Sequence, residues 1–247
     1  MNSIISKTKQ SFEASFAEAD RYNRQTQDSE HLNSILNTLM LENEDKLLDL
    51  GTGSGYLAFY IAKNYPNVTV FGLDIVSDTL NKNRQKAYEE KVPNIEFANY
   101  DGINNPYQNG FFDWVVTRYA LHHFPDIQHA FCETARVLKP GGYFFISDPT
   151  PNENDSLRFV DAYMQLLDDG HNKFYTLDEF VTFANYSGMK LVDYYYSSIT
   201  FPRKITNEYN ELLKKTSDEI KQSYNIKVID GEGYITEKVI NCIFLKN

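Results

Sequence analysis

The stretch Leu47-Leu48-Asp49-Leu50-Gly51-Thr52-Gly53-Ser54-Gly55-Tyr56-Leu57-Ala58 determines how the chain folds. Its apolar beginning predicts a buried parallel strand, and the apolar spacing that follows Tyr56 predicts a helix. Between the two stand three alternate glycines, Gly51, Gly53 and Gly55. Because glycine carries no Cβ atom, a ligand can lie directly against the backbone of this turn. The stretch therefore predicts a strand–turn–helix unit with a ligand site at the turn.

A dinucleotide is the first ligand to consider, since the G-x-G-x-x-G pattern directs a helix N-terminus at a pyrophosphate. Here the third glycine would fall at Tyr56, and Gly55 comes one position early. Asp49, at the tip of the strand, would also oppose a phosphate. These features disfavour an NAD(P)-dependent oxidoreductase, which stays the alternative enzyme class. A plain strand–helix connector is the alternative for the turn alone.

The pattern Asp49-x-Gly51-x-Gly53-x-Gly55 resembles the first motif of the class I S-adenosylmethionine (SAM) methyltransferases. SAM has no phosphate and carries a sulfonium and an ammonium, so a carboxylate at the strand tip suits it. The resemblance implies that these four residues and Thr52 contact the cofactor.

A second carboxylate, Asp74, ends the next predicted strand, Thr69–Leu73. An acid at this position can accept hydrogen bonds from both ribose hydroxyls, in NAD folds as in SAM folds. A helix-capping role is the alternative, but Ser77 and Asp78 already supply the start of the next helix. The resemblance therefore assigns Asp74 to the ribose and adds its neighbour Ile75 to the cofactor site.

A third predicted strand, Ile95–Asn99, leads into Asp101 and Gly102. In methyltransferases of this kind an acid here receives the adenine amino group, and the next backbone N–H faces the ring. Asp101 and Gly102 match this arrangement. An ordinary Asp-Gly turn is the alternative.

A fourth strand over Phe112–Thr117, a helix over Ile127–Leu138 and a fifth strand over Tyr143–Asp148 follow in order. Proline and glycine after Leu138 end the helix. This series closely resembles the small-molecule methyltransferases related to the ubiquinone/menaquinone-biosynthesis C-methyltransferases, over about residues 45–150. The resemblance implies an α/β fold: a Rossmann-like, doubly wound, seven-stranded sheet whose seventh strand is antiparallel.

Three residues after the fourth strand are candidates for chemistry. His122 and His123 lie beyond its C-terminal end, where open α/β sheets place their active sites, and the ordinary pKa of histidine suits a general base. His123 is the preferred catalytic candidate, and a role in shaping the loop is the alternative for the pair. Arg118, at the strand tip, could hold an acceptor carboxylate or brace the methionine arm of SAM.

The parts outside this core are expected to cover it. Residues 1–44 are predicted to form a helical N-terminal cap, residues 45–150 the SAM-binding core, and residues 151–247 the rest of the sheet with insertions. In related enzymes the N-terminal segment folds over the SAM pocket, which makes Tyr22 a candidate cofactor contact, with ordinary packing as its alternative.

Two insertions, about residues 150–175 and the polar, helical stretch 200–230, are expected to form a substrate-facing lid. The first insertion has apolar residues at the spacing of one buried face: Leu157, Val160, Tyr163, Leu166 and Leu167. Thr176 and Glu179 form the signature of a capping box at the start of a helix. Strands are predicted over Lys190–Ser197 and Tyr234–Leu245.

The tyrosine run 194–196 lies in the first of these last two strands. Strand alternation places either Tyr195 or the pair Tyr194 and Tyr196 on a given face. The run has two readings, simple sheet packing or an aromatic pocket over the acceptor or the methyl-sulfonium.

The composition of the chain limits the classes of binding partner to be expected. The chain has 247 residues and a formal net charge of −10, without a long basic run, so nucleic acid is not an expected partner. Its 2 cysteines show no metal-ligand spacing, and no metal is expected. Neither a signal peptide nor a membrane-spanning run is visible, which predicts a cytoplasmic location without membrane insertion. Monomer and homodimer stay open.

Together these features predict a SAM-dependent methyltransferase that acts on a small-molecule acceptor by in-line displacement and releases S-adenosylhomocysteine. A catalytically silent SAM-binding or SAM-sensing protein is a further alternative. The Asn/Asp-Pro-Pro-Tyr loop of enzymes that methylate adenine N6 or glutamine amides is missing after the fourth strand, where Arg118-Tyr119-Ala120 stands. Whether carbon, nitrogen, oxygen or sulfur receives the methyl group stays open.

Overall fold

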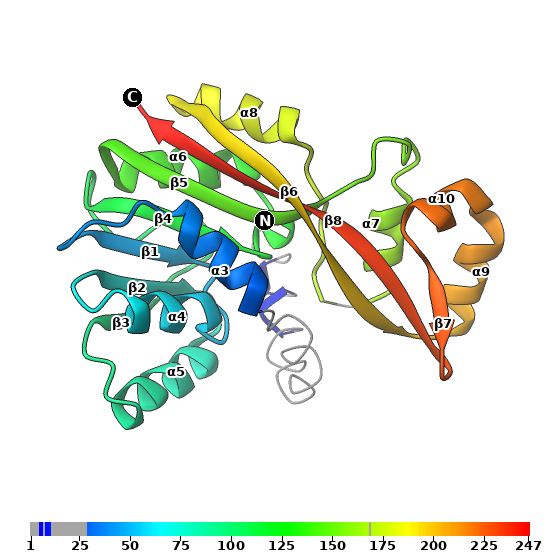
Figure 1. The fold of residues 1–247 in the computed structure, drawn as a ribbon, viewed down its shortest axis with the longest axis horizontal. Helices are drawn as coiled ribbons and strands as arrows, with labels where there is room; N and C mark the ends of the chain where they lie inside the picture. The colour runs from blue at the N-terminus through cyan, green and yellow to red at the C-terminus, as the bar shows by residue number, and fades with distance from the viewer. Residues whose placement is uncertain (1–4, 7, 11–28, 168) are drawn as a thin grey trace.

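One twisted sheet organises the computed structural model, which describes residues 5–6, 8–10, 29–167 and 169–247 (Figure 1). Its strand order is β3-β2-β1-β4-β5-β8-β6, and β7 pairs with β8. The first five strands pair in parallel, whereas β8 runs antiparallel to both β5 and β6. The strands are β1 (Lys46–Leu50), β2 (Thr69–Asp74), β3 (Ile95–Asn99), β4 (Phe112–Arg118), β5 (Leu138–Thr150), β6 (Met189–Lys204), β7 (Lys227–Ile229) and β8 (Glu232–Lys246).

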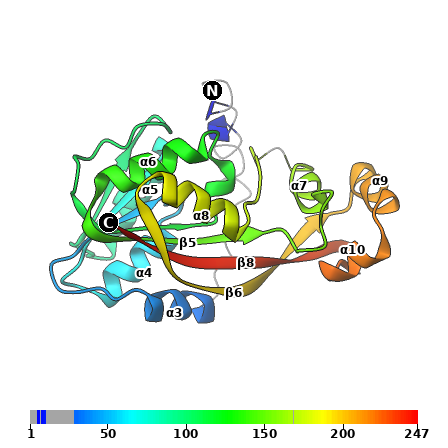
Figure 2. The same ribbon diagram turned by 90° about the horizontal axis from the view of Figure 1, so that it is seen from above.

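Helices cover both faces of the sheet, so its central strands are buried on two sides (Figure 2). One face packs against α3 (Ser29–Thr38), α4 (Tyr56–Asn64) and α5 (Ser77–Glu89). The other face packs against α6 (Ile127–Val137) and α8 (Leu177–Tyr186). Double coverage explains why the strands read as continuous apolar runs.

The long antiparallel pair of β6 and β8 extends beyond this core and carries a second lobe (Figures 1 and 2). The lobe contains α7 (Phe159–Met164), α9 (Asn207–Lys215), α10 (Asp218–Ser223) and β7. Its own apolar cluster joins residues of α7 to the inner face of the strand pair, among them Val160, Tyr163, Phe201 and Ile235. Both predicted insertions therefore contribute to one lobe.

The predicted fold is confirmed, with corrections in this lobe. The described residues form eight strands rather than seven, because Asp230 and Gly231 adopt left-handed backbone angles and close a hairpin between β7 and β8. The sixth strand extends to Lys204 rather than ending at Ser197, since alternate residues such as Ile199 and Phe201 are buried. The helical part of the 200–230 insertion begins only at Asn207.

The first insertion also differs from its predicted pattern. Val160 and Tyr163 are buried in α7, but Leu157 is 92% exposed, and Leu166 and Leu167 are exposed as well. The helix is short, ending at Met164, so the predicted periodicity does not continue through residue 167. The capping box of Thr176 and Glu179 at the start of α8 is present as predicted.

The helix α6 ends one residue earlier than predicted, and β5 begins at Leu138 instead of the predicted Tyr143. α6 ends at Val137, and Leu138 already pairs with Phe112 of β4. The pairing then shifts before Trp114 meets Tyr143, and the intervening turn uses the left-handed φ of 78° at Gly141. Across the described part of the chain, no helix is long and apolar enough to cross a membrane.

Candidate functional site

The glycine turn lies at the C-terminal end of β1 and is held to β2. The backbone N–H groups of Gly51 and Thr52 both donate to the carbonyl of Leu73, at 2.9 and 3.1 Å. Gly51 has a φ of +74°, and a Cβ atom there would stand 2.6 Å from the Cβ of Ala120. At Gly53, with a φ of +49°, a Cβ atom would meet no heavy atom of the described residues within 4 Å. One glycine therefore permits close packing, and the other leaves an open backbone surface.

Asp49 is buried at the end of β1 and accepts a hydrogen bond from the Thr52 hydroxyl at 2.7 Å. Burial raises the pKa of Asp49 to about 6, against the opposing effects of that hydrogen bond and the Arg118 charge. The Arg118 guanidinium lies over two rings, 4.1 Å from the centre of Tyr119 and 5.4 Å from that of Tyr56. The predicted strand-tip acid and strand-tip arginine thus face the same region.

Asp74 ties the glycine turn to the segment before α5. One carboxylate oxygen accepts from the Gly53 N–H at 2.8 Å, and the other accepts from the Val76 N–H at 2.9 Å. Burial raises its pKa, and these hydrogen bonds oppose the rise. The sequence argument that Ser77 supplies the helix start is wrong in part. Ser77 begins α5, but its N-cap is Val76, which has no side-chain cap, and Asp74 holds the Val76 N–H.

Asp101 closes the exposed turn after β3. Its Oδ1 accepts from the N–H groups of Ile103 and Asn104, both at 2.8 Å, and its Oδ2 accepts from the Asn104 amide at 3.2 Å. Partial burial would raise the pKa of Asp101, but these hydrogen bonds outweigh it and the pKa is lowered. The turn interpretation therefore describes the structure. Of the two carboxylate oxygens, Oδ2 accepts fewer hydrogen bonds.

Gly102 and Ile75 come together beside this turn. A Cβ atom on Gly102, whose φ is +80°, would stand 3.2 Å from Cγ2 of Ile75 and 3.3 Å from Cγ2 of Ile5. Ile5, near the N-terminus, thus lies beside the predicted adenine side of the site. Tyr22, the predicted cofactor contact of that segment, lies outside the described residues.

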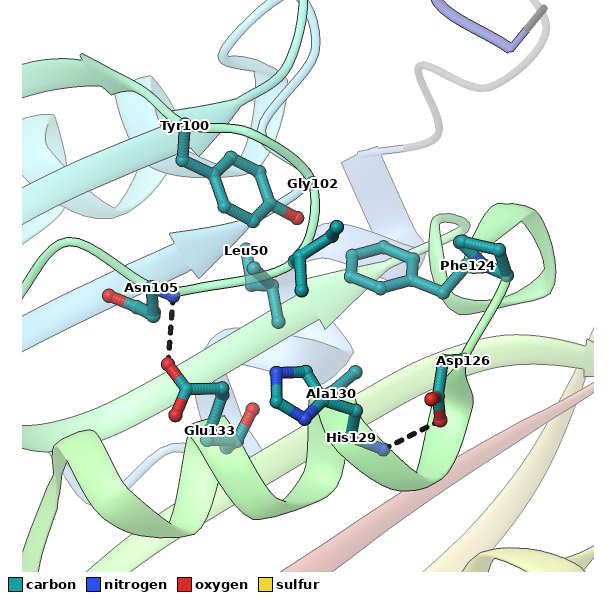
Figure 3. Close-up of a pocket in the computed structure, with 12 residues that line it drawn as sticks. Leu50, Tyr100, Gly102, Asn105, Phe124, Asp126, His129, Ala130 and Glu133 are labelled. Atoms are coloured by element: carbon teal, nitrogen blue, oxygen red, sulfur yellow. Dashed lines mark hydrogen bonds between the residues drawn. The ribbon is translucent and has the colours of Figure 1, made fainter. Parts of the chain in front are cut away.

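Figure 3 shows a pocket between the loop after β3 and helix α6. It adjoins the predicted adenine position through Gly102, and the Phe124 ring and Leu50 supply apolar walls. Its lining is Leu50, Tyr100, Gly102, Ile103, Asn105, Phe124, Pro125, Asp126, His129, Ala130, Glu133 and Thr134. Of these lining residues only Gly102 was predicted as a site residue, because they come from three separate segments that only the fold brings together.

His122 is buried in the short 3-10 helix η1 (Leu121–His123) and contacts Asp148 of β5. Its Nδ1 lies 2.5 Å from Asp148 Oδ1, while Asp148 Oδ2 accepts from the N–H groups of Leu121 and Ala120 at 2.9 and 3.2 Å. Burial raises the pKa of Asp148 to about 7 and holds the pKa of His122 well below its ordinary value. Asp148 therefore organises the whole segment after β4.

His123 stacks beside His122, with ring centres 4.1 Å apart. Removal from water, and then the neighbouring His122, lower the pKa of His123 to about 3. A histidine that resists protonation to this extent is a weak base at neutral pH. The preference for His123 as the general base is therefore not supported by its surroundings.

Buried polar residues of the lobe approach this segment and were missed by the sequence analysis. His171 Nε2 lies 3.0 Å from Asp161 of α7, and its ring lies 5.4 Å from that of His122. Glu237 of β8 and Arg203 of β6 are also buried. The burial of Glu237 could have been predicted from the sequence, because it stands between apolar residues on one face of a predicted strand.

The tyrosine run lies away from these groups. Tyr195 accepts hydrogen bonds from Ser34 and Thr38 of α3 at 3.3 and 3.4 Å. Tyr194 and Tyr196 are 48% and 44% exposed, with ring centres 5.9 Å apart. Of the two readings, packing and surface placement describe the run, and the aromatic-pocket interpretation is wrong.

Comparison with known proteins identifies the family. A model of a methyltransferase domain matches residues 41–180, which is more than half of the chain. This chain belongs to the methyltransferase domain family. The predicted resemblance to class I SAM-dependent methyltransferases is confirmed, and a dinucleotide-dependent oxidoreductase is not favoured.

Individual relatives within this methyltransferase family are distant. The uncharacterized methyltransferase YcgJ of Bacillus subtilis is 30% identical over 153 residues, which cover 62% of this chain and 60% of that protein. A demethylmenaquinone methyltransferase of Thermus thermophilus is 34% identical over 114 residues, covering 46% of this chain and 51% of the relative. The matches span at most 60% of the length of these relatives.

Solved structures extend the likeness of the fold. The crystal structure of YcgJ superimposes with a TM-score of 0.77 at 24% identity, covering 89% of this chain and 99% of YcgJ. A putative methyltransferase from Bacillus halodurans gives a TM-score of 0.78 at 25% identity, covering 87% of this chain and 98% of that one. The likeness of the fold thus covers more of this chain than the residues 41–180 that the family model matches.

Proposed function

We propose that the protein transfers a methyl group from SAM to a small-molecule acceptor. The observation that carries this proposal is the open backbone surface at Gly53, where a Cβ atom would meet no atom of the described residues within 4 Å. Asp49 and Asp74 flank that surface, and Ile75 and Gly102 stand together beyond it. A ligand with a cationic end, a ribose and a flat ring fits this order of groups.

The residues present fit each part of such a ligand. The carboxylate of Asp49, with Gly51 and Thr52, would hold the methionine end. Asp74 uses two of its roughly four acceptor positions on backbone N–H groups, which leaves capacity for the ribose hydroxyls. Bound SAM supplies a methyl group already activated by a positive sulfur.

The adenine end would lie between Ile75 and Gly102. The Oδ2 of Asp101 has capacity to accept the exocyclic amino group, since only the Asn104 amide reaches it, at 3.2 Å. Arg118, stacked on Tyr119 and Tyr56, would brace the methionine arm from the end of β4. Tyr22 stays a prediction.

Catalysis by this site depends mainly on alignment of the acceptor, because orientation can supply several kcal/mol of the barrier, roughly up to 7–11 kcal/mol in favourable cases. The lowered pKa values of His122 and His123 favour structural roles for both imidazoles. The net charge of −10 favours a small molecule over nucleic acid as the acceptor.

Calorimetric titration with SAM and S-adenosylhomocysteine tests the proposal. Asp74→Ala should weaken binding by about ten- to a hundredfold, because two hydrogen bonds to a buried carboxylate are lost. Asp78→Ala, on the exposed side of the first turn of α5, is the matched control and should bind as wild type. Absence of any SAM binding by the wild type would refute the proposal. Transfer of labelled methyl from SAM into a cell extract would then lead to the acceptor.

A further inference from the structure

Glu237 is a buried carboxylate whose two oxygens accept no hydrogen bond from any residue that the structure describes. It lies in β8 opposite Ile199 of β6, on the same face as Ile235 and Val239, and its exposed fraction is 0%. Neither of its carboxylate oxygens has a hydrogen-bond partner in the part of the chain that the structure describes. A buried carboxylate in this state is costly, so such groups are normally paired with a cation or a hydrogen-bond donor. Its position therefore points to a ligand that supplies the missing partner.

Arg203 occupies the same face of the strand pair but does not neutralise Glu237 directly. It is 7% exposed, one guanidinium nitrogen lies 2.8 Å from the sulfur of Met164, and its Nε has no hydrogen-bond partner in the described chain. Its guanidinium carbon stands 5.7 Å from the ring centre of Phe201 and 5.9 Å from that of Tyr163. The arginine is thus packed among α7 and the strand pair, at the end of the face away from the core.

Two carboxylates, Asp148 and Asp169, and one cation, Arg203, act electrostatically on Glu237. The pKa of Glu237 is raised to about 8, first by burial and then by the charges of Asp148 and Asp169, while Arg203 opposes the rise. His122 and His123 add little positive charge here, since burial lowers the pKa of both imidazoles. The carboxylates near Glu237 therefore outnumber the cations.

This acidic region adjoins the proposed SAM site. The charge of Asp148 acts on Glu237. Asp148 also accepts a hydrogen bond from the Ala120 N–H, and Ala120 packs against Gly51 of the glycine turn. Tyr119 lies edge-on to Phe201, with ring centres 6.4 Å apart, and so links the end of β4 to the face that carries Glu237. A molecule held by Glu237 on its Asp148 side would lie next to the end of β4.

We propose that Glu237 is the acceptor-binding residue of the enzyme and that it holds a protonated amine of a small, cationic acceptor. This inference rests on the proposed function and adds the chemical class of the acceptor. Phe201 and Tyr119 would pack against the apolar part of the molecule, and cation–π attraction adds to the preference for a cation. Arg203, farther along the face, limits the length of acceptor that fits.

Three probes of one shape test the proposal: benzylamine, benzyl alcohol and benzoate, each titrated into protein saturated with S-adenosylhomocysteine. We expect benzylamine to bind at least about tenfold more tightly than the other two, and to lose about tenfold or more in Glu237→Gln. Glu219→Gln, at an exposed position of α10, should bind benzylamine as wild type does. Equal binding of benzoate, or unchanged binding in Glu237→Gln, would overturn the proposal.

A second measurement uses the wild-type protein alone and does not depend on how the variant folds. Benzylamine binding at about pH 7 should release close to one proton per molecule, because a Glu237 carboxyl that is protonated in the free protein must ionise to pair with the amine. Titration in two buffers of different ionisation enthalpy measures this release. A crystal structure in which buried waters alone satisfy both oxygens would overturn the proposal.

Failure of this inference and failure of the proposed function give different results. If the wild type does not bind S-adenosylhomocysteine, the proposed function fails. If it binds S-adenosylhomocysteine but shows no preference for the amine, only the assignment of Glu237 and of the cationic acceptor fails.

Discussion

The Cβ atom of Ala120 lies 2.6 Å from the point at which a Cβ atom on Gly51 would stand. This approach joins the turn after β1 to the segment after β4, and it leaves no room for any side chain at Gly51. The same segment continues into η1, where Asp148 holds the backbone of Leu121. The glycine turn, the β4 segment and the buried end of β5 therefore form one connected unit, whose parts should respond together to substitution.

Gly51→Ala should be strongly destabilising and should abolish SAM binding. The alanine would need a left-handed backbone at a φ of +74° and would also collide with Ala120. We expect a loss of roughly 2–5 kcal/mol in the free energy of unfolding, the sum of strain and overpacking. Chemical denaturation and calorimetry measure the two effects. A variant with wild-type stability would contradict the described packing.

Gly53→Ala and Gly188→Ala separate binding from strain. Both glycines have positive φ, +49° and +76°, and neither Cβ atom would come within 4 Å of an atom in the part of the chain that the structure describes. Each variant should lose only about 1–2 kcal/mol of stability through backbone strain. Gly53→Ala should in addition weaken SAM binding by about tenfold or more, since its methyl group enters the proposed cofactor surface. Equal SAM affinity in the two variants would argue against a ligand at Gly53.

Asp148→Asn should disturb the acceptor side more than the cofactor side. The amide keeps one acceptor oxygen for the N–H groups of Ala120 and Leu121 but turns a donor toward His122. We expect a loss of about 1–3 kcal/mol in stability and a lower kcat, with SAM affinity changed by less than about fivefold. Asp178→Asn, exposed on α8, is the control. A fall in SAM affinity as large as the fall in kcat would place Asp148 in the cofactor site instead.

The sequence was sufficient to predict the core of the fold because its information there is local. The alternation of buried strands with glycine turns, from Leu47 to Asp148, predicted most elements to within about a residue, but β5 begins at Leu138 rather than at Tyr143. The predicted ends of the first two strands also located the carboxylates of Asp49 and Asp74. The structure places both beside the glycine turn.

The lobe could not be predicted equally well, because its burial depends on contacts between distant segments. Leu157 has apolar spacing with Val160 but is exposed, since α7 is too short to bury it. Conversely, Glu237 and Arg203 are charged residues buried by a strand pair whose length was underestimated. The pKa values of His122 and His123 also depend on this burial, so the sequence alone overestimated their suitability as bases.

The capping box of α8 provides a test of local stability. Thr176 Oγ1 accepts from the Glu179 N–H at 3.3 Å, and the Glu179 carboxylate accepts from the Thr176 N–H at 2.9 Å. Thr176→Ala should cost about 1 kcal/mol in the free energy of unfolding. Thr182→Ala, exposed within the same helix, should change stability by no more than about 0.5 kcal/mol. Because α8 packs outside the proposed site, SAM affinity should stay constant in both variants.

The pH dependence of stability provides the last test, since two buried carboxyl groups have raised pKa values. Burial raises the pKa of Asp148 to about 7 and that of Glu237 to about 8. A carboxyl group with a higher pKa in the folded state contributes its full stability below its unfolded pKa, near about 4, and loses it as the pH rises through the folded value. The free energy of unfolding of the wild type should therefore fall by a few kcal/mol, on the order of 1.4 kcal/mol per unit of pKa shift, between about pH 5 and about pH 9. Glu237→Gln cannot ionise at this position, so its stability should fall less and exceed that of the wild type at about pH 9. Chemical denaturation at both pH values, with Glu219→Gln as the control that follows the wild type, measures the difference. Parallel curves for Glu237→Gln and the wild type would mean that Glu237 ionises freely in the folded protein, against its burial between Ile235 and Val239.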